Sequence, residues 1–98
     1  MHARVNRIDA SAERIDDAAR RAEEVLLPLL QGMDGFRGFT ALADRSTGAQ
    51  IAISYWESED AMRASEEAVR QPRKDAVEAA GGRSDAVVVE RYEVLLHV

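Results

Sequence analysis

Few residues of this 98-residue chain can do chemistry, and three of them stand out. Trp56, the single tryptophan, offers an aromatic wall and an indole N–H that can donate a hydrogen bond to a ligand. Asn6 offers an amide that can donate to a carbonyl or to bound oxygen, and Ser54 offers a hydroxyl. Each residue also has a simpler interpretation, because a lone tryptophan can fill a core and a buried asparagine can satisfy backbone groups.

Thiolate chemistry is excluded because the chain has no cysteine. The two histidines, His2 and His97, fall in the first and last predicted strands, which are neighbours in the topology proposed below. A two-histidine metal site would follow if the side chains met. Terminal strand residues are usually solvated, however, and no acidic residue completes the ligand set, so we predict no metal site.

The composition narrows the class of partner. A net charge of -5 and a pI near 5.0 argue against nucleic acid, because binding to polyanions needs clustered positive charge. No apolar run approaches the roughly 18 residues of a membrane span, and residues 1–6 contain no signal-peptide core. We therefore expect a cytoplasmic protein that binds neither nucleic acid nor membrane.

Hydrophobic spacing and turn residues predict six elements in one domain over residues 1–98. They are a strand over residues 3–8, a helix from Ser11 to about residue 30, strands over 36–44 and 49–56, a helix from Ser58 to residue 80 and a long strand over 86–98. We expect Ser11 and Ser58 to cap the helices, Pro28 to loosen the last turn of the first helix, and Pro72 to break or bend the second. The order βαββαβ predicts an α+β, ferredoxin-like fold with a four-stranded antiparallel sheet.

Alternation along the strands separates two faces of this sheet. The more apolar set is Val5, Phe39, Ala41, Ala43, Ile51, Ile53 and Tyr55. The smaller and more polar set is Arg4, Asn6, Ile8, Gly38, Thr40, Leu42, Ala52, Ser54 and Trp56. Both helices must cover one face, so we expect them on the second set and a second copy of the chain on the first, as a sheet-to-sheet homodimer. In the alternative, both sets pack within a monomer.

The segment Tyr55-Trp56-Glu57-Ser58-Glu59-Asp60-Ala61 resembles the antibiotic biosynthesis monooxygenase domains of the dimeric α/β-barrel superfamily. Supporting features are Pro28, Gly35-Phe36 and the run from Glu90 to Val94. The resemblance implies two ferredoxin-like protomers packed sheet to sheet, each with a pocket between its sheet and its helices. It also implies cofactor-independent oxygenases, haem-degrading enzymes and other small-molecule proteins among the relatives.

The residues implied for the oxygenases match this chain only in part. The resemblance implies an asparagine four residues before the tryptophan and a tyrosine six residues after it, where this chain has Ala52 and Met62. Arg4 or Arg7 would have to replace the missing amide in holding an anionic intermediate. The pocket candidates are therefore Asn6, Ser54, Trp56, Arg4 and Met62.

The haem-degrading relatives imply a different set of residues. Asn6-Arg7-Ile8 matches their first strand, but the iron-binding histidine and the second tryptophan fall near Asp75 and Ser65. We therefore expect no cofactor. The hypothesis is a homodimeric protein with a pocket for a small apolar or aromatic molecule. The reaction to test first is cofactor-independent oxygenation of an aromatic or polyketide-like substrate. The alternative is a non-catalytic dimer that binds a ligand or a protein.

Overall fold

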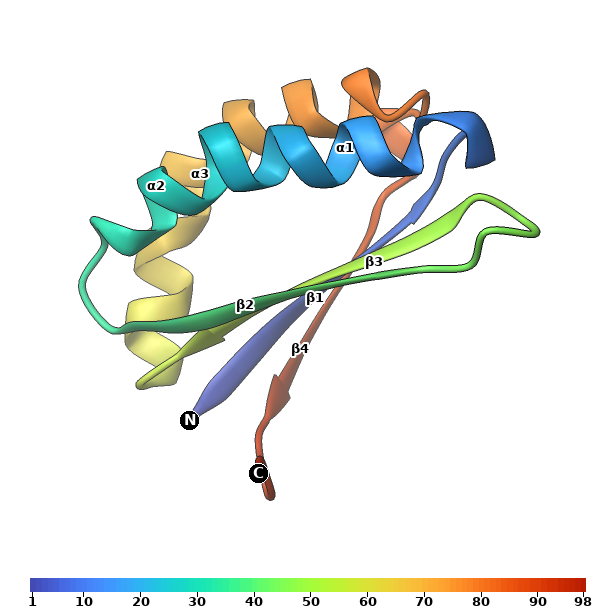
Figure 1. The fold of residues 1–98 in the computed structure, drawn as a ribbon. Coiled ribbons are helices and arrows are strands. Elements are labelled where there is room, and N and C mark those ends of the chain that lie inside the picture. The colour runs from blue at the N-terminus through green and yellow to red at the C-terminus, as the bar shows by residue number, and fades with distance from the viewer.

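Four antiparallel strands form one sheet, and the helices cover only one of its two faces (Figure 1). The computed structural model describes the backbone of residues 1–98 and every side chain except that of residue 84. In chain order the elements are β1 (His2–Asp9), η1 (Ala12–Arg14), α1 (Ile15–Arg21), η2 (Ala22–Leu26), α2 (Leu27–Gln31), β2 (Phe36–Ala43), β3 (Ala49–Trp56), α3 (Glu59–Ala79), η3 (Ser84–Ala86) and β4 (Val88–Glu93). The spatial order β2-β3-β1-β4 confirms the predicted ferredoxin-like topology.

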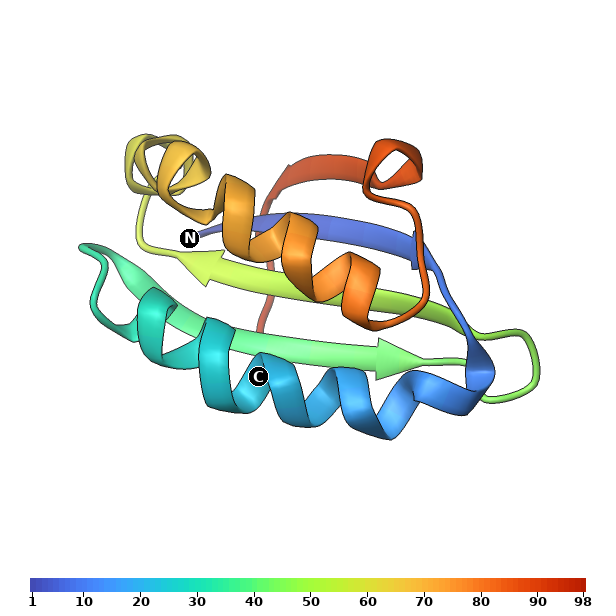
Figure 2. The same cartoon turned by 90° about the horizontal axis from the view of Figure 1, so that it is seen from above.

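The first helical layer is one rod made of the consecutive segments η1, α1, η2 and α2 (Figure 2). In η2, a π-helical turn, the N–H of Leu27 bonds the carbonyl of Ala22, five residues back. Pro28 follows at the start of α2 and has no N–H to continue the regular pattern, and a widened turn absorbs such a break. The predicted loosening therefore lies just before Pro28. The predicted side-chain cap by Ser11 is wrong, because this residue makes no capping bond.

Helix α3 begins at the predicted cap, and Pro72 does not break it. The hydroxyl of Ser58 accepts a hydrogen bond from the N–H of Ala61 at 3.1 Å, which satisfies one free donor of the first turn. The helix continues through Pro72 to Ala79, and its early and late parts run in different directions (Figures 1 and 2). Its buried side chains include those of Met62 and Val69, which form the core with Leu30 and Trp56.

The predicted faces are right for β1 and β3 and wrong for β2. In the register of the sheet, Phe39 lies opposite Ser54 and Ala41 lies opposite Ala52, so these residues face the helices. The cause is an irregularity between Phe36 and Gly38, where one extra residue is inserted into the ladder. A shift of one residue exchanges the two faces of a strand, which brings Phe39 into the core and turns Thr40 and Leu42 outward.

The outer face of the sheet, away from the helices, is divided. Its β2–β3 half is mainly apolar and carries Leu42, Ile51, Ile53 and Tyr55. Its β1–β4 half carries an ion pair between Arg7 and Glu90, and the hydroxyl of Tyr92 donates to Glu90 at 2.8 Å. The outer face is thus less uniformly apolar than the sequence predicted.

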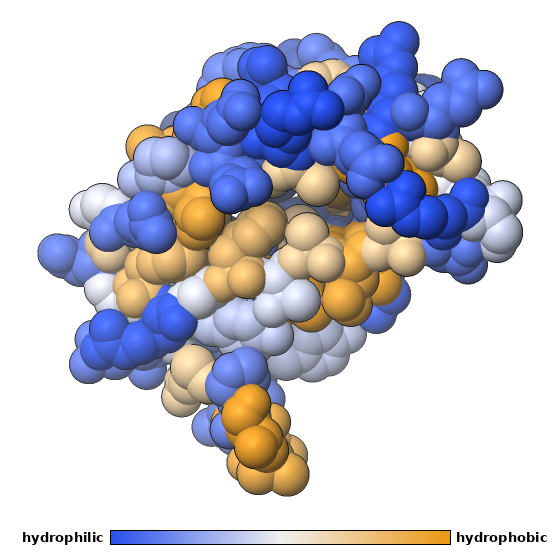
Figure 3. Space-filling model, viewed as in Figure 1, coloured by the Kyte–Doolittle hydropathy of each residue, from blue (hydrophilic) through white to orange (hydrophobic). Residues whose placement is uncertain are grey.

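The last strand is shorter than predicted, because β4 ends at Glu93 and not at Val98. The N–H of Val94 still bonds the carbonyl of Met1 at 2.8 Å. Beyond it the chain leaves the sheet on the side away from the helices (Figure 1). The ring of His97 packs against that of Tyr55, with 5.0 Å between the ring centres. The tail exposes apolar side chains, with Leu95 at 88% and Leu96 at 84% (Figure 3).

The hairpin turn between β2 and β3 gives a test of the fold. Gly48 has a φ of +84°, and an added Cβ would lie 2.2 Å from the carbonyl oxygen of Ala10. We expect Gly48→Ala to lower the free energy of unfolding by at least about 2 kcal/mol, through both the left-handed backbone and the clash. Urea denaturation measures the loss.

Gly32→Ala is the matched control. Gly32 has a φ of -83°, and its nearest contact to an added Cβ is 3.6 Å away. We expect no loss and up to about 1 kcal/mol of gain. Equal destabilisation by the two substitutions would contradict the turn geometry.

Candidate functional site

The centre of the site is a buried arginine in the middle strand β1. Arg4 is only 2% exposed, and its Nη1 donates to the carbonyl of Met62 at 3.1 Å and to the hydroxyl of Ser65 at 2.9 Å. The hydroxyl of Ser65 in turn donates to the carbonyl of Met62 at 2.6 Å. Strand alternation directs Arg4 at α3, and the i, i+3 spacing of the two helical residues places both acceptors on one turn.

Trp56 forms a wall beside this arginine. The guanidinium carbon of Arg4 lies 5.5 Å from the centre of the Trp56 ring, within the range of a cation–π contact. The ring is fully buried, and Phe36 meets it edge-on at 5.5 Å. Its Nε1 donates to the hydroxyl of Ser54 at 2.9 Å. The indole N–H that we expected to be free for a ligand is therefore engaged within the protein.

The electrostatic surroundings of Arg4 are unusual for so buried a charge. Desolvation lowers the pKa of Arg4 to about 10; Glu66 acts in the opposite direction, and Arg73 and Arg91 add to the lowering. Arg4 therefore remains protonated at neutral pH. The carboxylate of Glu66 is itself bound by Arg91, which holds the pKa of Glu66 below its usual range. Three guanidinium groups thus act on one carboxylate, since Arg91, Arg4 and Arg63 all lower the pKa of Glu66.

A small cavity of about 50 Å³ lies beside Arg4, which is one of its lining residues. Its polar lining comes from Arg4, Asn6, Ser54 and Arg73, and its apolar lining includes Leu30 and Val69. The Nη1 of Arg73, on α3, donates weakly to the side-chain oxygen of Asn6 at 3.5 Å. The cavity is therefore walled by two cations and an amide on one side and by the core on the other.

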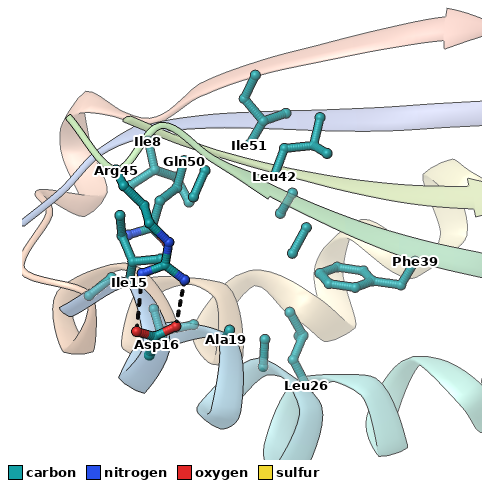
Figure 4. Close-up of a pocket in the computed structure, with 17 residues that line it drawn as sticks. Ile8, Ile15, Asp16, Ala19, Leu26, Phe39, Leu42, Arg45, Gln50 and Ile51 are labelled. Atoms are coloured by element: carbon teal, nitrogen blue, oxygen red, sulfur yellow. Dashed lines mark hydrogen bonds and ion pairs between the residues drawn. The ribbon is translucent and has the colours of Figure 1, made fainter. Parts of the chain in front are cut away.

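A larger groove of about 330 Å³ continues from the cavity along the first helical layer (Figure 4). The two spaces share the lining residues Ile8, Leu26, Phe39 and Ala52. The groove exists because both of its walls carry many small side chains, which leave space that larger residues would fill. These are Ala18, Ala19 and Ala22 on the helical side, Ala41, Ala43 and Ala52 on the sheet, and Ala76 and Ala80 at the end of α3 and just beyond it.

An ion pair lies at the outer end of the groove. Two nitrogens of Arg45, in the β2–β3 loop, donate to the two carboxylate oxygens of Asp16 on α1, at 2.8 and 3.1 Å (Figure 4). The hydrogen bond from Arg45 is the main cause that lowers the pKa of Asp16. The hairpin is thereby connected to the helix across the rim of the groove, where apolar side chains are also visible from outside (Figure 3).

The structure brings the five predicted pocket residues together on the helical face of the sheet. Arg4, Asn6, Ser54, Trp56 and Met62 are all buried. Met62 contributes its carbonyl to Arg4, while its side chain belongs to the core. Of the five, Arg4, Asn6 and Ser54 line the cavity of about 50 Å³.

Other predicted candidates lie elsewhere. Arg7 is on the outer face and is paired with Glu90, so it cannot substitute for the missing amide. His97 packs on the outer face against Tyr55, whereas His2 lies opposite inward-facing Trp56, so the sheet separates the two histidines. Among the side chains that the structure describes, His, Asp and Glu nowhere gather in a group of three or more able to hold a metal ion.

Sequence reasoning expected a pocket between the sheet and the helices but missed Arg73 and most of the residues that line the groove. Arg73 was part of a helical stretch with acids nearby, a pattern typical of a solvated face. The alanines of the helix and of β2 were a visible signal, since facing small residues leave a void, but the wrong face assignment for β2 hid Ala41 and Ala43. Within the described residues, no helix combines the length and the apolar composition that a bilayer crossing requires.

Fold and site together define a ferredoxin-like α+β protein with an apolar groove that ends at a buried cationic group. The chain belongs to the antibiotic biosynthesis monooxygenase family, whose pattern it matches over residues 1–79. It is 40% identical over 94 residues to the uncharacterized protein Rv2557 of Mycobacterium tuberculosis, a match that covers 96% of this chain and 41% of the relative. The chain thus spans about two fifths of the length of the curated relatives it matches.

Two solved structures show the same fold. One is SnoaB, a cofactor-independent oxygenase from Streptomyces nogalater, with a TM-score of 0.69 and 20% identity over 99% of this chain and 95% of that one. The other is the heme-degrader MhuD of Mycobacterium tuberculosis with two hemes bound, with a TM-score of 0.71 and 20% identity over 100% of this chain and 99% of that one. At such identity the likeness concerns the fold.

The hydrogen bonds of Arg4 give a test of the site. We expect Ser65→Ala to lower the free energy of unfolding by about 1 to 3 kcal/mol, because it removes one of the two acceptors that hold the buried Arg4 guanidinium. Thermal and urea denaturation measure the change. The control is Ser46→Ala in the exposed hairpin loop, which should cost no more than about 0.5 kcal/mol. Equal effects would show that Arg4 does not depend on Ser65.

Proposed function

We propose that this chain binds a small, largely apolar and aromatic or polyketide-like molecule in the groove, and that it oxygenates this molecule without a cofactor. The observation that carries the proposal is a groove of about 330 Å³ that leads to a buried, protonated arginine. Apolar walls with a few placed polar groups are the usual composition of a small-molecule site. The likeness to SnoaB, a cofactor-independent oxygenase, supports this reaction class.

The chemistry required of the protein is modest. An anthrone loses a C–H proton to become an enolate, which transfers an electron to O₂. Recombination forms a C–O bond and, with a proton, a hydroperoxide. Loss of water then leaves a second carbonyl, so one oxygen atom enters the product and the other leaves as water with the two hydrogens of the original CH₂. The protonated guanidinium of Arg4 would stabilise the enolate, and the apolar groove would exclude bulk water.

The position of the missing amide fits this assignment. Ala52 lines both the groove and the inner cavity, at the position where the family resemblance implies an asparagine. An alanine there cannot hold an anion, whereas Arg4 lines the same cavity and carries a positive charge. Arg4 is therefore our candidate for the group that polarises the substrate.

Haem is a poorer fit to the residues of this chain, despite the likeness to MhuD. Helix α3 contains no histidine, and the positions implied for the iron ligand and the second tryptophan hold Asp75 and Ser65. Ser65 already serves Arg4. We propose no step that uses haem.

A second candidate function is binding without catalysis. It is favoured by the engaged indole N–H of Trp56 and by Ala52 and Met62 at the two positions that differ from the oxygenase pattern. The two candidates share the groove and differ only in turnover.

We further propose that two copies of the chain meet through their outer faces in a homodimer. The β2–β3 half of that face is apolar, and the neighbouring tail exposes Leu95 and Leu96. A second copy would remove these groups from water, and each tail would then reach the sheet of its partner.

Sedimentation tests the dimer. At micromolar concentration we expect a mass of about twice 10.8 kDa, and we expect Ile53→Glu to give the protomer mass because it places a charge in the interface. Leu29→Glu, on α2 and 38% exposed, should leave the dimer intact. A stable protomer in the unchanged protein would contradict the proposal.

Oxygen uptake tests the reaction. Metal-free protein given an anthrone should consume one O₂ per quinone formed, faster than the same solution without protein. Ala52→Leu should abolish this excess rate, because the larger side chain fills space in both cavities. Ala12→Leu, exposed and outside the groove, is the control. Binding without uptake would support the non-catalytic candidate, and absence of both would contradict the pocket.

A further inference from the structure

Arg73 occupies a special position between two spaces. It lines the inner cavity with Arg4 and Asn6, and it also lines a second, shallower groove of about 220 Å³ between α3 and the segment before β4. Its side chain is partly buried, and its hydrogen bond to Asn6 is at 3.5 Å, the long limit for such a bond. Arg73 is thus held near the cavity by a weak contact that a stronger partner can replace.

The pairing of the arginines sets Arg4 and Arg73 apart. The chain has 13 basic residues, of which Lys74 is the only lysine, leaving 12 arginines. Eight of these form ion pairs with acids, and all eight are exposed. In the part of the chain that the structure describes, the two arginines withdrawn from water, Arg4 and Arg73, have no carboxylate within ion-pair distance.

This arrangement is costly in the absence of a ligand. Two neutral acceptors and the Trp56 ring replace only part of the hydration that the buried Arg4 guanidinium loses, and two like charges near one cavity repel each other. The Nε of Arg4 is buried and has no hydrogen-bond partner. Glu66, the acid that acts most on Arg4, is already bound to Arg91. The missing component is a negative charge in the inner cavity.

We infer that Arg73 and the amide of Asn6 bind a carboxylate group carried by the ligand in the inner cavity, where Arg4 adds a positive charge and remains the group that stabilises the enolate, and that the apolar ring system extends into the adjoining groove. The inference rests on the proposed binding function and specifies the substrate class as aromatic acids. The cavity of about 50 Å³ suits a group of a few atoms, whereas the rings need the groove of about 330 Å³. Guanidinium groups bind carboxylates by short, charge-assisted hydrogen bonds, which are stronger than the present contact between Arg73 and Asn6.

Arg73 is in this view the specificity-determining residue. Arg4 is fixed by the carbonyl of Met62, by Ser65 and by the Trp56 ring, so it is part of the framework as well as of the site. Arg73 has one weak contact and access from the second groove, so it can turn to the ligand without disturbing the core. Its removal should therefore change what binds and leave the fold intact.

Calorimetric titration with two matched probes tests the inference. The probes are 2-naphthoate and 2-naphthamide, which share the ring system and differ in charge. We expect 2-naphthoate to bind the unchanged protein at least tenfold more tightly than 2-naphthamide. Arg73→Gln should weaken 2-naphthoate about tenfold and change 2-naphthamide less than twofold, with an unchanged thermal unfolding midpoint.

Arg70→Gln is the matched control, since Arg70 lies on the same helix, lines the second groove and is paired with Glu67. It should alter neither probe by more than twofold, which separates a local contact from a general effect of charge. Equal affinities for the two probes, or an Arg73→Gln variant that keeps the preference, would overturn the carboxylate site and leave the pocket standing. Failure of both probes to bind would overturn the pocket, and with it the proposed function.

Discussion

A guanidinium group buried between the sheet and α3 is the constraint on which the rest of this site depends. Arg4 is placed there by the alternation of β1, and its charge can be tolerated only because a helical carbonyl, the hydroxyl of Ser65 and the face of Trp56 surround it. These three groups come from α3 and β3. The packing of α3 on the sheet and the burial of the Arg4 charge therefore depend on the same contacts.

The same interaction explains why a hollow can exist in so small a domain. Arg4, Trp56, Met62 and Val69 fill the sheet–helix space at one end, while small side chains line the other end. Stability is supplied by the filled end, where the core cluster lies. The open end contributes less to the core and is free to accept a guest. One end of the interior thus supplies stability, and the other end leaves space for a ligand.

Much of this architecture follows from the sequence. The strand–cap–helix junction at Trp56 and Ser58 depends on local chemistry and was predictable. The face assignment of β2 was wrong, because one irregularity near Gly38 inverts it, and a glycine within a strand indicates only that such an insertion can occur. The five pocket candidates were drawn together by topology, but their roles depend on contacts between distant positions. Arg73 and Asn6 are separated by 67 residues, and no periodicity connects them.

The alanine walls of the groove have a further consequence for how such a protein diversifies. Ala18 and Ala22 stand on the first helical layer, away from Arg4 on β1 and Arg73 on α3. Each can gain one or two methyl groups without altering Arg4 or its partners. The shape of the ligand and the sign of its charge are therefore determined by separate parts of the chain, so substitutions can change the preferred shape and leave the preferred charge unaltered.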